Sequence, residues 1–153
     1  MESIFDLPAH PLFVHFPIVL VPLAALGALA VVFNIEWRRR FGPALVLATL
    51  VGAIATILAA ASGEPFNELL PLGDVADKHR DLGETARLLS VVFFVLTAVM
   101  VAAERFKPDR VSPNVLRAMS VVVALAGVLA TIWMIRTGHE GARITWDGVL
   151  PTD

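Results

Sequence analysis

The four histidines are the side chains of this 153-residue sequence best suited to chemistry, and each lies near the edge of a hydrophobic run. His10 and His15 stand at the start of the first run, His79 precedes the third, and His139 follows the fourth. Imidazole ligates haem iron, zinc, copper and non-haem iron. Because the sequence has no cysteine, thiolate metal sites, iron–sulfur ligation and covalent haem attachment through Cys-x-x-Cys-His are excluded.

The spacing of the first two histidines separates them around a helix. Pro11 suits the first helical position, which puts His10 at or near the cap and His15 about one turn inside. Five residues turn a helix by roughly 140°, so the two rings are not expected on one face. Ionisable groups inside a membrane span are costly and usually functional, which makes His15 the stronger candidate.

Glycines accompany the other two histidines. Residues 74–83 begin with acids that favour a helix start outside the membrane, and Gly83 leaves space one turn below His79. Gly138 and Gly141 flank His139 and permit a tight turn and a close approach to something flat or bulky.

Four uncharged or nearly uncharged runs must position these residues. They cover about 11–33, 42–62, 84–104 and 117–136. Each is close to the ~20 residues that cross a bilayer. The apolar fraction of 57% and the mean hydropathy of +0.75 exceed the roughly 45–50% apolar content of soluble domains. The sequence predicts an all-α integral membrane four-helix bundle that forms a single domain, 1–153. The net charge of −2 predicts no nucleic-acid partner.

Basic residues are concentrated in two of the three connections between the runs. Seven lie in or beside the first and third connections: Arg38, Arg39, Arg40, Arg105, Lys107, Arg110 and Arg117. Five lie on the other side: Lys78, Arg80, Arg87, Arg136 and Arg143. By the positive-inside rule, the first and third connections are expected to be cytoplasmic. Both termini and all four histidines are then expected on the periplasmic or extracellular side of a bacterial inner membrane.

The order of these motifs resembles a bacterial family of predicted four-helix membrane proteins, domain of unknown function 2231. The resemblance covers nearly the whole chain and rests on His10-Pro11, His15-Phe16-Pro17, Ser62-Gly63, His79 with Gly83, and Gly138-His139-Glu140-Gly141. The family's last motif usually has a second glycine and a following tyrosine; here Ala142 and Trp146 stand near those positions. Relatives fused to Rieske-type iron–sulfur domains imply a redox setting.

The first functional hypothesis is a b-type cytochrome with one haem near the outer face. Bundles commonly build cofactor sites from facing helices. We expect His15 and His79 as axial ligands, with His139 as the alternative partner. The full set of candidate haem-binding residues is His10, His15, His79, His139, Gly63, Gly83, Arg87 and Arg136, where the glycines make room for the ring and the arginines hold the propionates. A quinone or a soluble redox protein would exchange the electron.

Two other hypotheses remain open. A site for zinc, copper or iron without haem would draw on His10, His15, His79, His139, Glu64 and Glu140. In the other hypothesis the chain is a small accessory subunit of a larger membrane complex, since small residues suit helix association in lipid. An electron-transfer or accessory role is favoured over a stand-alone enzyme. No inverted repeat or mid-span charge supports a transporter.

Overall fold

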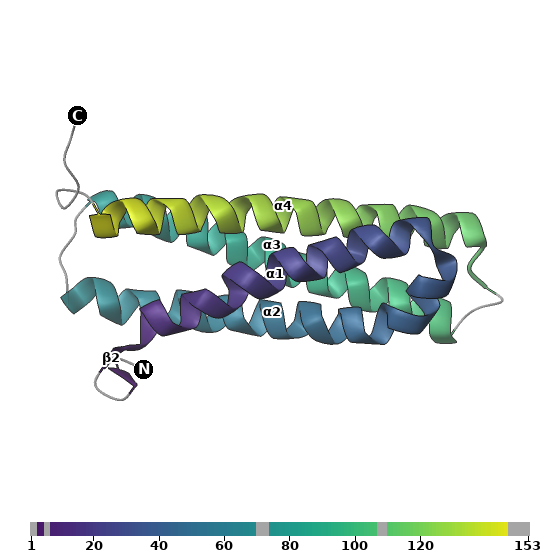
Figure 1. Cartoon of the computed structure of the whole chain (residues 1–153), viewed down its shortest axis with the longest axis horizontal. Helices are drawn as coiled ribbons and strands as arrows, with labels where there is room; N and C mark the ends of the chain where they lie inside the picture. Colours follow the sequence, from purple (N-terminus) through teal and green to yellow (C-terminus); the bar gives the residue numbers. More distant parts are fainter. Residues whose placement is uncertain (1–2, 5–6, 70–73, 107–109, 147–153) are drawn as a thin grey trace.

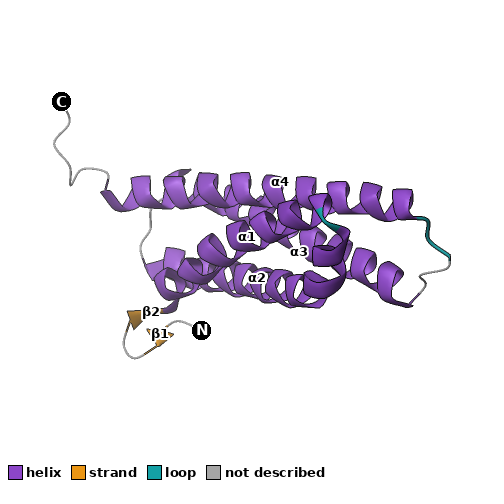
Figure 2. Cartoon of the chain, turned by 45° about the vertical axis from the view of Figure 1, so that its right-hand side comes forward, coloured by secondary structure: helices purple, strands orange, loops and turns teal. Residues whose placement is uncertain are grey.

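The computed structural model describes residues 3–4, 7–69, 74–106 and 110–146, and helix makes up nearly all of them (Figure 2). The helices are α1 (Ala9–Phe33), α2 (Ile35–Leu69), α3 (Asp74–Phe106) and α4 (Pro113–Trp146). Two short antiparallel strands, β1 (Ser3–Ile4) and β2 (Leu7–Pro8), precede α1. Each of the four helices is long and apolar enough to cross a membrane, and each contains one predicted span. The prediction of an all-α fold with four such helices is confirmed.

The helices run up and down in a bundle in which α1 and α3 each pack against both α2 and α4. The starts of α1 and α3 and the ends of α2 and α4 share the left side of Figure 1. We call this the histidine end, after His10 and His79, and the opposite one the arginine end, after Arg38 and Arg105. Helices α2, α3 and α4 have 35, 33 and 34 residues. At ~1.5 Å per residue each exceeds a ~30 Å hydrocarbon core, so their ends reach the headgroup layer.

The turn between α1 and α2 is shorter than the sequence suggested. The side chain of Asn34 caps α2, since its Oδ1 accepts hydrogen bonds from the backbone N–H groups of Glu36 (2.9 Å) and Trp37 (3.1 Å). Residues 37–40, which lie between the first two apolar runs of the sequence, therefore belong to the first turns of α2.

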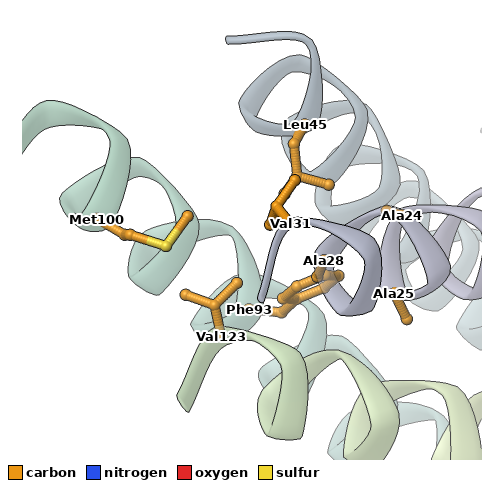
Figure 3. Packing of buried hydrophobic residues seen from close by; sticks show 8 residues of the cluster. All are labelled: Ala24, Ala25, Ala28, Val31, Leu45, Phe93, Met100 and Val123. Atoms are coloured by element: carbon orange, nitrogen blue, oxygen red, sulfur yellow. The ribbon is translucent and has the colours of Figure 1, made fainter. Parts of the chain in front are cut away.

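All four helices contribute to the apolar core drawn in Figure 3. Its buried members are Ala24, Ala25, Ala28, Val31, Leu45, Phe93, Met100 and Val123. Small residues bring the helices close, as expected for packing in lipid. A Cβ added at Gly127 would lie only 2.9 Å from Cζ of Phe93, so the aromatic ring rests against the backbone of α4.

The two helical hairpins, α1–α2 and α3–α4, bury corresponding positions. Five buried positions of α1 have a buried counterpart 69 residues later in α3: Pro17 and Ala86, Val21 and Ser90, Ala24 and Phe93, Ala28 and Thr97, Val31 and Met100. Between α2 and α4 the separation is 78 residues, as for Arg38 and Leu116, Gly42 and Ser120, Leu45 and Val123, Thr49 and Gly127, Gly52 and Ala130, Thr56 and Met134, Ser62 and Glu140. The pattern describes two equivalent hairpins that point the same way, related by an approximate two-fold axis along the bundle. Parallel repeats of this kind occur in membrane proteins.

Candidate functional site

His10 lies in the first turn of α1, and its imidazole packs half-buried against the backbone of α2. Its Nδ1 lies 3.0 Å from the carbonyl oxygen of Ala59 and 3.3 Å from Oγ of Ser62. A Cβ added at Gly63 would lie 3.2 Å from Cε1 of the ring, so the lack of a side chain at Gly63 leaves room for the imidazole. Because a carbonyl oxygen only accepts hydrogen bonds, Nδ1–H is the donor to the carbonyl of Ala59. In this tautomer the lone pair of the ring is on Nε2.

His79 has the same relation to α4 that His10 has to α2. Its Nδ1 lies 3.1 Å from the carbonyl oxygen of Thr137, to which it donates. A Cβ added at Gly141 would lie 3.0 Å from Cε1 of its ring. In each hairpin the glycine follows the accepting residue by four positions, one helical turn, so the two sites match in detail.

The two histidines meet across the bundle. Their ring centroids are 6.0 Å apart, and the ring planes stand at 90°. They occupy equivalent positions of the repeat, 69 residues apart like the buried pairs of α1 and α3. The approximate two-fold axis therefore passes between two imidazoles that are held in the same tautomer by equivalent bonds.

The other two histidines are at the same end of the bundle but point elsewhere. His15 is exposed, and its Nδ1 bonds to the carbonyl of Pro11 in its own helix. His139 is exposed on α4. The structure thus brings His10, rather than His15, to His79. The expectation that the rings of His10 and His15 lie on different faces agrees with this arrangement.

A buried carboxylate lies close to the histidine pair. Glu140 is only 5% exposed, and Lys78, the neighbour of His79 in sequence, donates to its Oε2 at 2.9 Å. Arg143 approaches the other oxygen at 3.8 Å. Ser62 occupies the equivalent position in the first hairpin, so Glu140 makes the two halves of the site chemically different.

The remaining candidates have partners outside the histidine pair. Glu64, an expected metal ligand, is exposed and lies 3.7 Å from Arg80. Arg87 forms an ion pair with Glu84 of its own helix. The guanidinium of Arg136 lies 4.9 Å from the ring centroid of Trp133, also on its own helix.

The glycines near these residues differ in how closely a neighbouring side chain approaches them. A Cβ added at Gly83 would make an ordinary 3.8 Å contact with Thr137, and one at Gly138 would lie 2.7 Å from Cδ1 of Ile18. The expectation of a tight turn at Gly138 and Gly141 is wrong, because α4 continues to Trp146. The expectation of a close approach to a flat group is met by the imidazole that rests against Gly141.

Sequence reasoning missed two features of the structure. The first is that His10, rather than His15, pairs with His79. In the sequence, Gly63 and Gly141 are the features that indicate this pairing. The other is a buried ion pair at the arginine end between Arg38 and Glu104, 66 residues apart. Among the side chains that the structure describes, in residues 9–65, 76–106 and 110–146, no three from His, Asp or Glu gather as a metal-binding group.

The comparisons with known proteins point to one family. The family model described as "Predicted membrane protein (DUF2231)" matches residues 6–153. Neither the curated proteins nor the solved structures include a match to the chain. Since the family model covers nearly the whole sequence, this chain belongs to the DUF2231 family of predicted membrane proteins.

Proposed function

We propose that this membrane protein binds one b-type haem at its histidine end, between His10 and His79, and serves in electron transfer. The observation that carries the proposal is the symmetric imidazole pair, with each Nδ1 bonded to a helix carbonyl. Ligating histidines usually donate their second ring N–H to such a group, which fixes the tautomer and the ring orientation. Haem bound in this way would supply reversible one-electron chemistry.

The separation of the rings fits a single ion held between them. An imidazole nitrogen lies ~2.0–2.1 Å from a bound metal. Adding about 1 Å from each nitrogen to its ring centre, two rings on opposite sides of one ion have centroids roughly 6 Å apart. The observed 6.0 Å agrees with this value. The 90° between ring planes is compatible, since rotation about a metal–nitrogen bond leaves the bond intact.

The number of available ligands favours haem over an ion held by protein alone. Structural and catalytic zinc sites take three or four protein ligands. The described part of the chain brings together only two imidazoles here, and Glu140 is already paired with Lys78. Haem brings four nitrogen ligands of its own, so two histidines complete its coordination.

The chain's own groups would position and balance such a cofactor. Gly63 and Gly141 let the imidazoles lie against α2 and α4, and the two carbonyl bonds hold each ring at a set angle. Lys78 and Arg143 place two positive charges beside Glu140 at this end. They join Arg87 and Arg136 as candidates for holding the propionates, a task suited to cationic donors.

The first test is an ultraviolet–visible spectrum of detergent-purified protein expressed with a haem supply, before and after dithionite. A Soret band that shifts on reduction, with sharp α and β bands and one haem per chain, is expected for two imidazole ligands. A colourless protein that takes up no haem would refute the proposal. Elemental analysis of that protein would then separate a metal site from an accessory subunit.

We also propose that the arginine end faces the cytoplasm of a bacterial inner membrane, which puts the histidine end on the periplasmic or extracellular side. The support is the excess of basic residues at the arginine end, seven against five. On this proposal a quinone or a soluble redox protein would exchange electrons with the haem from the outer face.

The orientation can be tested by single cysteines, because the native sequence contains none. We expect Glu64→Cys, an exposed position at the histidine end, to react with a membrane-impermeant maleimide on intact cells. Arg117→Cys, exposed at the arginine end, should react only after the cells are opened. The reverse pattern would contradict the proposed orientation.

A further inference from the structure

A groove between α2 and α3 at the arginine end has no role in the haem proposal. It encloses about 380 Å³ and is lined by Arg38, Arg39, Pro43, Val101, Glu104 and Arg105. Its wall combines three guanidinium groups and one carboxylate with the apolar surfaces of Pro43 and Val101. Both charge and apolar surface are therefore available to one ligand.

The charges of the groove favour an anion. The single Nε–H of Arg38 is shared between the two carboxylate oxygens of Glu104, each 3.1 Å away, and Nη2 donates to Oε1 at 3.0 Å, so these two side chains neutralise each other. Arg39 lies 3.6 Å from the same carboxylate, and its side chain is 69% exposed. Arg105 is exposed as well. The groove thus carries two positive charges in excess, on side chains that a ligand can reach.

The surroundings of the groove place it at the level of the lipid headgroups. Trp37 and Phe41 are exposed neighbours on α2, with ring centroids 6.4 Å apart. The guanidinium of Arg40 lies 5.4 Å from the centroid of Phe41. Exposed aromatic and basic residues at helix ends are typical of the membrane–water interface. A phosphate in the groove would therefore lie at the depth of a phospholipid headgroup.

We propose that this groove binds the headgroup of an anionic phospholipid, with its phosphate on Arg39 and Arg105 and its glycerol and upper acyl chains along Pro43 and Val101. Guanidinium groups match phosphate oxygens in two-point hydrogen bonds. Basic pockets between membrane helices are recognised sites for such headgroups. Arg38 and Glu104 keep the arginine end of α2 and α3 together and so preserve the shape of the groove.

The test is native mass spectrometry of delipidated protein titrated with phosphatidylglycerol or phosphatidylcholine in one detergent. The wild type should bind one phosphatidylglycerol at least tenfold more tightly than phosphatidylcholine. The double variant Arg39→Ala/Arg105→Ala should lose about 25-fold in affinity for phosphatidylglycerol, since each basic residue near the membrane surface contributes roughly fivefold. Equal binding of the two lipids by the wild type would overturn the proposal without any variant.

The matched control is Arg117→Ala, which removes an exposed arginine from the same end but outside the groove. It should keep phosphatidylglycerol binding within about twofold of the wild type. A loss as large as that of the double variant would show general attraction to charge and overturn the proposed site. Competition with glycerol phosphate distinguishes a lipid headgroup from a soluble phosphate as the bound anion. If glycerol phosphate fully displaces the lipid at equal concentration, the site binds a soluble phosphate and the proposed lipid site is overturned. If the lipid stays bound, the lipid site is supported.

Discussion

Replacing either His10 or His79 by alanine is expected to abolish the six-coordinate haem spectrum of the purified protein. Each residue would supply one of two axial bonds, so neither variant can complete the coordination. Loss of an outer-shell partner alone costs 10–100-fold in metal affinity, and we expect at least ~100-fold for loss of a ligand. The measurements are the α and β bands after dithionite and the haem content per chain.

His15→Ala and His139→Ala are the matched controls, because they remove imidazoles from exposed positions at the same end of the bundle. Both variants should keep the wild-type bands and haem content. If His15→Ala loses haem while His10→Ala retains it, the axial pair is His15 with His79, and the assignment from the symmetric pair is wrong.

A ligand exchange separates coordination from folding. Methionine is an alternative axial ligand of haem and raises the reduction potential relative to histidine. We expect His10→Met to retain haem with a more positive midpoint potential. Circular dichroism should report the same helix content in all of these variants. A His10→Met protein with an unchanged potential would argue against ligation by His10.

Helix number and the gathering of histidines at one end could be predicted, because both depend on where apolar runs begin and end. The rotation of each helix about its own axis could not. The sequence sets an angle of roughly 140° between His10 and His15 but does not say which of them faces the bundle. In the structure Pro17 and Val21 are buried, which turns His10 toward the interior and leaves His15 outside.

The internal repeat is hidden in the sequence for a chemical reason. The acceptors of the two imidazole bonds are backbone carbonyls, which any residue supplies, so Ala59 and Thr137 can differ. Only the positions under the rings demand one residue type, and there both hairpins have glycine, Gly63 and Gly141. In the corresponding buried pairs burial repeats while identity does not, as where Ser62 corresponds to Glu140.

The buried ion pair at the arginine end leads to the largest expected effect on stability. The side chains of Arg38 and Glu104 are 3% and 9% exposed, and the guanidinium donates from Nε and Nη2 to the carboxylate. Glu104→Ala would leave the arginine buried without its counter-charge. Removal of one partner of such a pair costs about 3–5 kcal/mol. Thermal unfolding in one detergent should show a clearly lower midpoint than that of the wild type.

The matched control for this prediction is the variant Glu84→Ala. The ion pair of Glu84 and Arg87 lies on α3, with side chains 48% and 42% exposed, and its loss should cost no more than ~1 kcal/mol. A second comparison, Arg38→Met/Glu104→Leu, removes both charges; it should recover most of the lost stability, because apolar side chains of similar size often replace a buried pair without cost. Equal midpoints for Glu104→Ala and Glu84→Ala would contradict the burial of the pair. Recovery in the double variant would show that the cost arises from the uncompensated charge of Arg38, and that the pair chiefly sets how α2 and α3 meet.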